Sequence, residues 1–559
     1  MVKELQGVIM PTIEFSLKDL ERLLGKKIDL EELKNEGILF VKGEIDEERN
    51  GKLKVDIKDT NRPDLWSIEG VTRELKGHYR IEEGLPKFKI QKSGLTVIVD
   101  KKVENVRPKT VCAVVKKLKL DDEAIKQMIQ LQEKVCQTFG RNRDMAAIGV
   151  YDYDKIKGPI KYTTFKPNEL KFEPLGLKRK MNLKEILTKH PKGKEYGYLL
   201  RDKKEYPIFI DSAKNVLSMP PIINSNYTGK VDENTKNVFI EVSGHEINHI
   251  SVALNVIVTA LKERGGKLYS VDVKYGNKTV TTPDLTPKKA RMNMENCRKI
   301  LGMDISAKEM LKLLRQSRFD AKLKGKEIEV SYVPYRNDIM DERDVMEDIA
   351  ISFGYNNIEP EEPKIYTKGE GTKKERLSNK IREICIGLGI QEVLNFTLSS
   401  KEDLLERMRI KDDIVEIENP VSSSWCVFRN SLIPNCLRFL SYNKHVEYPQ
   451  KIFEIGDVIK IDEGKETKTR DVRNLAILIT GIKIGYEEIS SLLNSLMENL
   501  KVEYKIEEMR NEKFIEGRCA SVFVDKKLIG EIGEIHPEIL ENFGLEMPVV
   551  SLELNLEGL

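Results

Sequence analysis

Four acidic residues in the second half of the chain have the type and spacing of a metal site. Asp344, Glu347 and Asp348 are three and four residues apart, so on a helix their carboxylates share one face, and Asp338 adds a fourth carboxylate from the preceding loop. Carboxylate oxygens suit Mg²⁺, which binds one or two directly and reaches others through water. Val345 and further apolar residues fill the opposite face. The spacing therefore predicts a magnesium site on an amphipathic helix.

The same residues also have a purely structural explanation. Acidic side chains are favoured in the first turn of a helix by its dipole, and Asp338 followed by Asp341 is typical of a helix cap. Spacing alone does not separate the two explanations. Ile351 lies in the middle of the acidic arc, where a solvated surface needs no apolar residue, and it favours a functional face.

A second motif indicates a different metal. Residues 245–249, His-Glu-Ile-Asn-His, match the His-Glu-x-x-His pattern in which two histidines on one helix face bind zinc. A catalytic zinc needs a third protein ligand. Glu263 is the nearest candidate, but it stands about fourteen residues further on, at the far end of the predicted helix. A stand-alone zinc hydrolase that uses His245 and His249 is therefore the alternative hypothesis.

The composition of the 559-residue chain limits the classes of function. Lys and Arg number 94 against 91 Asp and Glu, a net charge of +3, so contact with nucleic acid must come from local patches or a partner. The seven cysteines include no Cys-x-x-Cys pair, which is typical of reduced cytosolic thiols. Residues 1–6 lack signal-peptide character, and the longest mostly apolar run, 250–261, is too short to span a bilayer. We expect a soluble cytoplasmic protein without a membrane partner.

An internal duplication must position the acidic helix. A short helix with a Ser or Asn cap that ends at Leu-Gly is predicted at 16–25 and again at 293–302. Each copy continues with a second helix, an alternating strand and an Arg-x-Asp motif, at 62–64 in the first copy and 336–338 in the second. Only the second copy has the acidic cluster. The matching positions of the first copy are occupied by Gly70, Arg73 and Glu74.

The duplication divides the chain into four parts and predicts an α+β multidomain fold. The two copies are small α+β modules at 1–95 and 276–360, and a mixed α/β domain at 96–275 lies between them. In the last part, 361–559, alternating apolar residues with Gly and Asp turns predict an antiparallel sheet. Helices are predicted at 121–139, 244–263 and 376–388, and strands at 111–115, 207–210 and 392–397.

Motifs dispersed along the whole chain resemble one family. The segment 428–437 resembles the class II aminoacyl-tRNA synthetase core as it occurs in the β subunit of phenylalanyl-tRNA synthetase. The other matching segments are 60–67, 217–224, 338–358, 417–420, 452–458, and 517–518 with 532–537. They follow in order from end to end and are similar to the shorter archaeal and eukaryotic form.

The resemblance implies a class II core without catalytic motifs. Arg429 stands where the second motif would hold ATP phosphates, but Asn430 and Ser431 follow instead of an acidic partner, and no Gly-rich third motif ending in arginine follows. In the family, adenylation and transfer take place on the α subunit. The resemblance therefore implies a β subunit of phenylalanine–tRNA ligase that needs ATP, Mg²⁺, tRNA(Phe) and an α partner in an α2β2 heterotetramer. It places magnesium at Asp338, Asp344, Glu347 and Asp348.

The middle part, 96–275, is similar to the editing domain of that family. An apolar phenylalanine pocket rejects tyrosine by only about a hundredfold, so mischarged Tyr-tRNA(Phe) has to be hydrolysed in a second pocket. A pocket that hydrogen-bonds the tyrosine hydroxyl disfavours phenylalanine, which leaves its polar groups unpaired. We expect Glu241 to accept that hydroxyl, with Ser218, Asn224 and Ser243 as further polar lining. As an alternative, each of these residues is a helix cap or turn former.

Two other classes of function stay open beside this one. The zinc hydrolase predicts one bound zinc that is lost when His249 is replaced. A pure RNA-binding scaffold predicts strong affinity for tRNA without a partner, which the near-neutral net charge of +3 disfavours.

Overall fold

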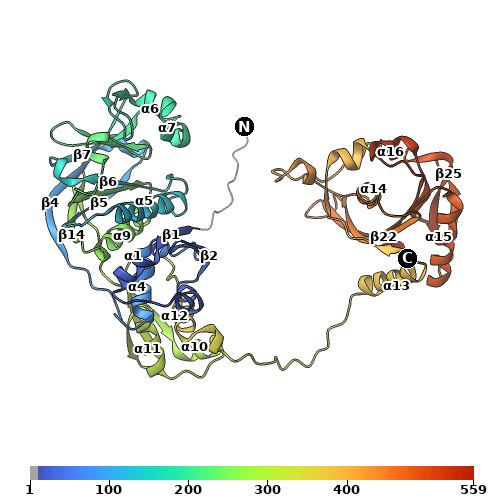
Figure 1. Ribbon diagram of the computed structural model, residues 1–559, viewed down its shortest axis with the longest axis horizontal. Helices are drawn as coiled ribbons and strands as arrows, with labels where there is room; N and C mark the ends of the chain where they lie inside the picture. Colours follow the sequence, from blue (N-terminus) through green and yellow to red (C-terminus); the bar gives the residue numbers. More distant parts are fainter. Residues whose placement is uncertain (1–10) are drawn as a thin grey trace. The chain divides into compact units, whose positions relative to one another are not determined.

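The computed structural model describes residues 11–559, so the stretch 1–6 lies outside the described residues. The chain forms two compact units, Met1–Glu361 and Glu362–Leu559, which are described separately below (Figure 1). Both combine helices and sheets, so the α+β multidomain class is confirmed. Among residues 11–559, every helix is too short or too polar to cross a lipid bilayer.

The first copy of the duplication is a three-stranded sheet covered by helices. Its elements are β1 (Thr12–Ser16), α1 (Leu17–Leu24), α2 (Leu30–Glu32), α3 (Ile38–Phe40), β2 (Gly43–Arg49), β3 (Lys52–Ile57) and α4 (Ile68–His78). The strands are antiparallel in the order β1-β3-β2. As the sequence predicts, Ser16 caps α1, and Gly25 ends it with a φ of 75°, where a side chain would be strained.

The second copy repeats this topology. Its elements are β16 (Lys288–Asn293), α10 (Met294–Leu301), α11 (Ala307–Gln316), β17 (Asp320–Lys324), β18 (Glu327–Tyr332) and α12 (Glu342–Phe353). The strand order β16-β18-β17 matches that of the first copy, and Asn293 and Gly302 cap α10 as predicted. The sequence pattern missed the opening strand and the first hairpin strand of each copy.

A ten-stranded sheet organises the region between the copies. Its main elements are β4 (Ile90–Val99), β5 (Lys109–Lys116), α5 (Asp122–Gln137), β6 (Ala146–Asp152), β7 (Ile160–Phe165), β10 (Tyr206–Ile210), β11 (Val216–Met219), β12 (Ile223–Asn224), β13 (Val238–Gly244), α9 (Ile247–Glu263), β14 (Lys267–Tyr275) and β15 (Lys278–Thr282). The strand order is β12-β11-β10-β7-β4-β14-β5-β13-β6, and β15 pairs with β14. The predicted strands 111–115 and 207–210 and both predicted helices are present.

The two ends of this sheet meet. Asn224 on the end strand β12 donates from Nδ2 to the carbonyl of Val150 on the opposite end strand, β6, at 3.2 Å. The small helices α6 (Leu183–Lys189), α7 (Pro191–Tyr196) and α8 (Asn226–Gly229) and the short strands β8 (Lys171–Phe172) and β9 (Met181–Asn182) extend the same region. The sheet is therefore strongly curved, and it encloses space between strands that are far apart in its order.

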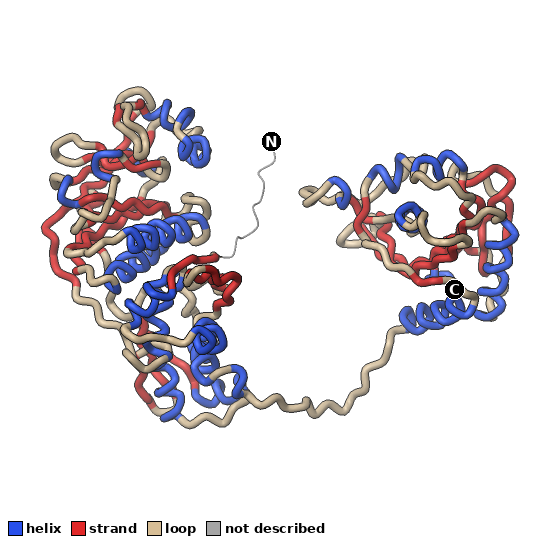
Figure 2. Tube along the Cα trace, viewed as in Figure 1, coloured by secondary structure: helices blue, strands red, loops and turns tan. Residues whose placement is uncertain are grey.

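Helices α5 and α9 pack below this sheet (Figure 2). Helix α9 is buried from Val252 to Leu261, because it packs against β5 and β13 and also against α4 of the first copy. The apolar run 250–261 is thus a core helix, since a helix apolar on nearly all sides must be covered on all sides.

The second unit, Glu362–Leu559, is built around a seven-stranded sheet. Its main elements are α13 (Lys373–Gly387), β19 (Gln391–Glu392), β20 (Leu398–Ser399), β21 (Val427–Phe428), α14 (Ile433–Tyr442), β22 (Gln450–Ile461), β23 (Thr469–Thr480), α15 (Tyr486–Leu500), β24 (Lys505–Glu508), β25 (Phe514–Val524), β26 (Lys527–Ile535), α16 (Pro537–Asn542) and β27 (Val549–Asn555). The order is β19-β22-β23-β27-β26-β25-β24, with every pair antiparallel except β19 with β22.

The predicted strand at 392–397 is wrong beyond its first residue. Only Gln391–Glu392 pair as β19, and a loop follows. The Glu454 side chain accepts a hydrogen bond from the backbone nitrogen of Asn395 at 3.2 Å, in place of a neighbouring strand. Leu394 is 87 % exposed, so alternation of apolar residues alone was misleading here.

Candidate functional site

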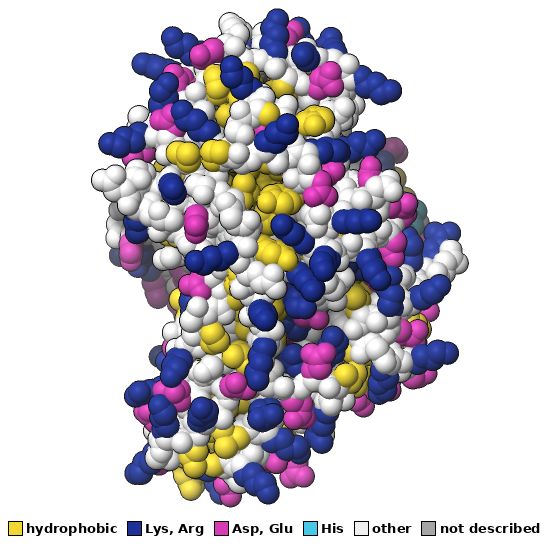
Figure 3. Space-filling view, turned by 90° about the vertical axis from the view of Figure 1, so that its left-hand side faces the viewer, with side chains coloured by type: hydrophobic (Ala, Val, Ile, Leu, Met, Phe, Trp, Pro, Cys, Tyr) yellow, Lys and Arg dark blue, Asp and Glu magenta, His cyan; other side chains and the backbone are white. Residues whose placement is uncertain are grey.

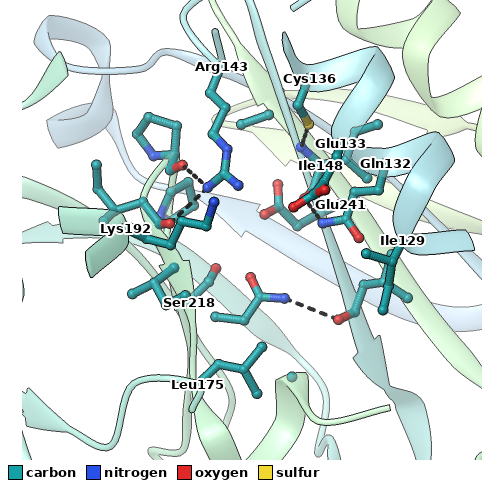
Figure 4. A pocket seen from close by; sticks show the side chains of 18 of the residues that line it. Ile129, Gln132, Glu133, Cys136, Arg143, Ile148, Leu175, Lys192, Ser218 and Glu241 are labelled. Carbon is teal, nitrogen blue, oxygen red and sulfur yellow. Dashed lines mark hydrogen bonds between the residues drawn. The ribbon is translucent and has the colours of Figure 1, made fainter. Parts of the chain in front are cut away.

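A pocket of about 290 Å³ lies where the two ends of the ten-stranded sheet meet (Figure 4). Its walls are mostly apolar and come from α5, β6 and the turn between β11 and β12. Three of the four residues predicted for an editing pocket line it, namely Ser218, Asn224 and Glu241. Ser243 does not line the pocket, so its predicted role in the lining is wrong.

Glu241 is the buried polar end of the pocket. It lies on β13 and is 2 % exposed. Its Oε1 accepts a hydrogen bond from the Tyr151 hydroxyl at 3.0 Å, whereas Oε2 has no hydrogen-bond partner among the described residues. Burial raises the pKa of the carboxyl to about 8, although Tyr151, the charge of Arg107 and Ser243 oppose the rise. A buried oxygen without a partner is costly unless a ligand pairs with it.

The other three predicted residues have distinct roles. The Oγ of Ser218 on β11 lies 2.7 Å from the Tyr151 hydroxyl oxygen, within hydrogen-bond distance. Asn224 on β12 holds the end strand β6 through the hydrogen bond given above. Ser243 is buried behind the pocket, where its Oγ accepts from the Arg107 Nε at 3.0 Å. All of them lie in strands, so the explanation as helix caps or turn formers is wrong.

Sequence reasoning missed several residues of this pocket. Arg143 comes from the loop before β6, and its Nη1 donates to the carbonyls of Pro221 and Ile222 at 3.2 and 2.9 Å. Its guanidinium lies 4.1 Å from the ring centre of Tyr196. Arg143 and Lys192 line the same pocket as Glu241 (Figure 4). Their sequence surroundings carry no signal, because they join the pocket only through the curvature of the sheet.

This arrangement is suited to a ring that carries a hydroxyl. Apolar walls suit an aromatic ring, and a hydroxyl both donates and accepts, so it could pair with Oε2 in either protonation state of Glu241. A plain phenyl ring would leave that oxygen unpaired inside the protein, which would cost binding free energy.

The acidic cluster of the second copy is not assembled around one point. Asp338 accepts from the Arg336 Nε at 2.9 Å and from its Nη2 at 2.5 Å. Asp348 accepts from the same Nη2 at 2.6 Å. Burial would raise the pKa of Asp338, but the charges of Arg336 and Arg62 outweigh it and lower that pKa to about 2. Two of the four predicted magnesium ligands are therefore hydrogen-bonded by one buried arginine.

The remaining two carboxylates have partners elsewhere. Asp344 accepts from the backbone nitrogens of Met340 and Asp341 at 2.7 and 2.8 Å and forms a capping box with Asp341, whereas the capping explanation had paired Asp338 with Asp341. Glu347 pairs with Lys42 of the first copy at 2.9 Å. Across residues 11–559, no group of three or more His, Cys, Asp or Glu could hold a metal ion. The four carboxylates do not fit a magnesium site in this conformation, and the metal assignment stays a prediction.

The position of Ile351 has a structural reason. Ile351 packs against the core that includes the first copy, so the acidic face of α12 is a contact between the two copies. The first copy contains the same device, because Arg62 bonds Asp64 at 3.0 and 2.8 Å and lies 3.6 Å from Glu74. Ile351 is therefore explained by this contact, and its position no longer favours a functional face.

The zinc-hydrolase hypothesis is wrong in its geometry. His245 precedes α9, and only His249 lies on the helix. The His249 ring stacks on Phe139 at 4.0 Å, and its Nε2 lies 3.0 Å from the Phe139 carbonyl. Glu263 ends the helix and pairs with Arg73 at 3.1 Å. The predicted ligands thus have separate partners, consistent with the metal-cluster result for residues 11–559.

In the second unit, Arg429 is engaged inside the protein. It is 2 % exposed, and it donates from Nη1 to Glu454 at 2.6 Å and from Nε to the Asp457 carbonyl at 3.0 Å. This guanidinium is not presented to a nucleotide, which agrees with a core that lacks the other catalytic motifs.

Comparison with known proteins gives one consistent result. Family models match in order along the chain: the B3/4 domain over residues 97–265, the tRNA synthetase B5 domain over 290–355, and the phenylalanyl tRNA synthetase beta chain CLM domain over 358–556. The phenylalanine–tRNA ligase beta subunit of Pyrococcus horikoshii is 47% identical over 555 residues, 98% of this chain and 100% of the relative. That of Pyrococcus furiosus is 48% identical over 556 residues, with the same coverage.

A solved structure adds to these sequence matches. The crystal structure of an N-terminal fragment of the phenylalanyl-tRNA synthetase β subunit from Pyrococcus horikoshii aligns with a TM-score of 0.60 and 49% identity. The alignment covers 62% of this chain and 100% of the fragment. Sequence and fold thus point to the same relatives.

Proposed function

The chain belongs to the family of phenylalanine–tRNA ligase β subunits, and from this premise we propose that it serves as the β subunit in the ATP-dependent attachment of phenylalanine to tRNA(Phe). The observation that carries the proposal is full-length similarity, because relatives at 47% and 48% identity cover 98% of the chain. A shared domain alone would leave the function open. Here the similarity extends through the whole order of domains.

The aminoacylation chemistry belongs to an α partner. In the second unit of this chain, Arg429, the candidate for the second class II motif, is bound by Glu454 and is not free to hold ATP phosphates. The partner would bind ATP and phenylalanine, and two α and two β chains would form an α2β2 heterotetramer in the cytoplasm. In this proposal the chain has four domains, at residues 1–95, 96–275, 276–360 and 361–559. A mixed surface supports the need for a partner in tRNA binding, since Lys and Arg are interspersed with Asp and Glu on the face in Figure 3.

No step of the proposed function of this chain depends on a magnesium ion. Magnesium at Asp338, Asp344, Glu347 and Asp348 remains part of the proposal only as a prediction. Arg336 and Lys42 supply the positive charge that a cation would bring to three of these carboxylates.

The chain's own activity would be hydrolysis of mischarged Tyr-tRNA(Phe) in the pocket of the ten-stranded sheet. The unpaired Oε2 of Glu241 supports this assignment. The apolar walls hold the ring and exclude water from its sides, while Glu241 pairs with the hydroxyl that distinguishes tyrosine from phenylalanine. The scissile ester would then lie toward the mouth, where water has access.

Copurification tests the subunit assignment. The full-length chain is coexpressed with a candidate α subunit, and the complex is sized and assayed for charging of tRNA(Phe). We expect a stable complex that charges tRNA(Phe) with phenylalanine, and a chain that forms no aminoacyl-adenylate when purified alone. Adenylate formation by the isolated chain would overturn the division of labour.

Deacylation tests the editing assignment separately. The complex is given Tyr-tRNA(Phe) and Phe-tRNA(Phe) in parallel, and release of each amino acid is followed over time. We expect rapid release of tyrosine and slow release of phenylalanine. Equal rates would remove the editing function without touching the subunit assignment.

A further inference from the structure

A single phenol joins the two ends of the curved sheet. Tyr151 lies on the end strand β6 and is fully buried. Its hydroxyl contacts Ser218 on β11 at 2.7 Å and Glu241 on β13 at 3.0 Å. In the strand order, five strands separate β11 from β13, so this contact exists only because the sheet closes on itself.

The hydroxyl of Tyr151 fixes one side of the Glu241 carboxyl. A phenol carries one proton and accepts as well, so it can donate to one of its two neighbours and accept from the other. It occupies Oε1 of Glu241 and leaves Oε2 as the oxygen without a partner among the described residues. Glu241 and Ser218 both line the pocket. The two polar groups that a ligand meets are therefore held by the same side chain.

The backbone is shaped to admit this contact. Gly149 faces Glu241 across the β6–β13 pair. A Cβ at Gly149 would lie 2.2 Å from the Tyr151 hydroxyl and 2.7 Å from Oε1 of Glu241, closer than such atoms approach. A side chain at this position would thus displace both groups.

We propose that Tyr151 is the positioning residue for tyrosine selectivity: its hydroxyl holds Glu241 and Ser218 so that Oε2 of Glu241 faces the ligand hydroxyl. The inference rests on the proposed editing function and deepens it. A polar group held in place by its neighbours loses less conformational freedom when it binds. The Tyr151 hydroxyl also lies among the groups that set the pKa of Glu241.

The test replaces Tyr151 by phenylalanine in the full-length chain and measures the α–β complex. The quantity is the ratio of kcat/KM for deacylation of Tyr-tRNA(Phe) to that for Phe-tRNA(Phe). Loss of one buried hydrogen bond to a carboxyl changes an equilibrium by about tenfold, so we expect Tyr151→Phe to lower the ratio about tenfold. The matched control is Tyr162→Phe, because Tyr162 is equally buried and its hydroxyl bonds the Arg107 carbonyl at 2.9 Å, outside the pocket lining.

The ratio separates positioning from mere packing. A structural role would lower both deacylation rates together and leave the ratio unchanged, which would overturn the inference. An unchanged ratio at unchanged rates would overturn it as well. If the wild-type complex itself shows no preference for Tyr-tRNA(Phe), the editing function fails and this inference fails with it.

A second variant keeps the test decisive if Tyr151→Phe does not assemble with the α subunit. Gly149→Ala retains Tyr151, Ser218 and Glu241 but forces their polar groups apart. We expect the same direction of change in the ratio, with charging of tRNA(Phe) retained. A Gly149→Ala complex that keeps the wild-type ratio would overturn the inference.

Discussion

The acidic face of α12 and the single Glu241 of the middle domain differ in how their charges are balanced. At α12 and the loop before it, Asp338 and Asp348 share Arg336, Asp344 completes the capping box, and Glu347 pairs with Lys42. Glu241 instead has one oxygen bonded to Tyr151 and the other unpaired in the interior. The carboxylates of the acidic cluster therefore have partners within the chain, whereas one carboxyl oxygen of Glu241 has no hydrogen-bond partner among the described residues.

The difference shows that carboxylate number is a poor guide to a binding site. Buried charges are tolerated when they are paired and hydrogen-bonded, and such pairs hold structural elements together. A buried polar atom without a partner needs a reason, and a ligand or an ordered water is one. Both copies of the duplication use the paired arrangement, since Arg62 and Asp64 repeat Arg336 and Asp338.

The largest effect is expected when the paired carboxylates Asp338 and Asp348 lose Arg336. Arg336→Met removes the partner of Asp338 and Asp348 and leaves two buried carboxylates together. We expect a loss of roughly 3–5 kcal/mol in unfolding free energy, measured by chemical denaturation of the full-length chain. The control is Arg343→Met, whose side chain is 77% exposed on α12 and which should change stability by less than about 0.5 kcal/mol.

Magnesium sharpens this prediction. If the carboxylates freed by Arg336→Met bind Mg²⁺, the ion restores part of the lost stability by mass action. Wild type should gain less from the ion than Arg336→Met, because its carboxylates are already paired. A larger stabilisation of the wild-type chain than of Arg336→Met would contradict the structural explanation of the cluster.

The next largest effect is expected when Glu241, with its unpaired oxygen, is replaced. Glu241→Leu takes away the polar end of the pocket, so we expect deacylation of Tyr-tRNA(Phe) by the complex to fall roughly 10- to 100-fold. Charging with phenylalanine should continue, because it takes place on the α subunit. Glu205→Leu, at a half-buried glutamate outside the pocket lining, is the matched control. Retention of full deacylation in Glu241→Leu would remove Glu241 from the site.

A smaller effect is expected in the pH dependence of stability, which should differ in sign between Asp338 and Glu241. The pKa of Asp338 is lowered to about 2, so its pairing stabilises the fold above its unfolded pKa of about 4 and is lost as the pH falls through about 2. The contribution is about 2 kcal/mol, and Asp338→Asn should remove it at pH 7. The pKa of Glu241 is raised to about 8, so its cost to stability grows as the pH rises from about 4 to about 8.

Apparent Tm measured against pH checks both signs. Asp338→Asn should make the chain less stable at pH 7 and flatten its loss of stability between pH 4 and 2. Glu241→Gln should have the opposite sign and raise the Tm most at alkaline pH. The same sign in both variants would mean that the two carboxyls have similar surroundings.

The smallest effects concern the exposed carboxylates of α12. Asp344→Ala removes the N3 carboxylate of the capping box that Asp341 forms at the start of α12, and it should cost about 1 kcal/mol. Glu347→Gln breaks a pair with Lys42 in which the glutamate is 48% exposed, and it should cost less than about 1 kcal/mol. Equilibrium denaturation measures both. Costs of several kcal/mol would indicate that these residues hold something besides their partners seen here.

The sequence by itself determined the local elements of this protein. Ser16 and Gly25 fix the ends of α1, and Asn293 and Gly302 those of α10, because caps act within one turn of the chain. Helix α9 follows from its apolar run, which needs cover on all sides. The end-to-end order of motifs also determined the family, since it does not depend on any single contact.

Only the tertiary structure decided which side chains meet. Ser218 and Glu241 were expected in one pocket from the resemblance, but Tyr151 entered through a contact between sheet ends that no local pattern encodes. The motif at 336–338 shows Arg336 beside Asp338, but it does not show that Arg336 also reaches Asp348, or that Lys42 of the first copy meets Glu347. Spacing along a helix places charges on one face, but the opposite charges that meet them come from outside that helix.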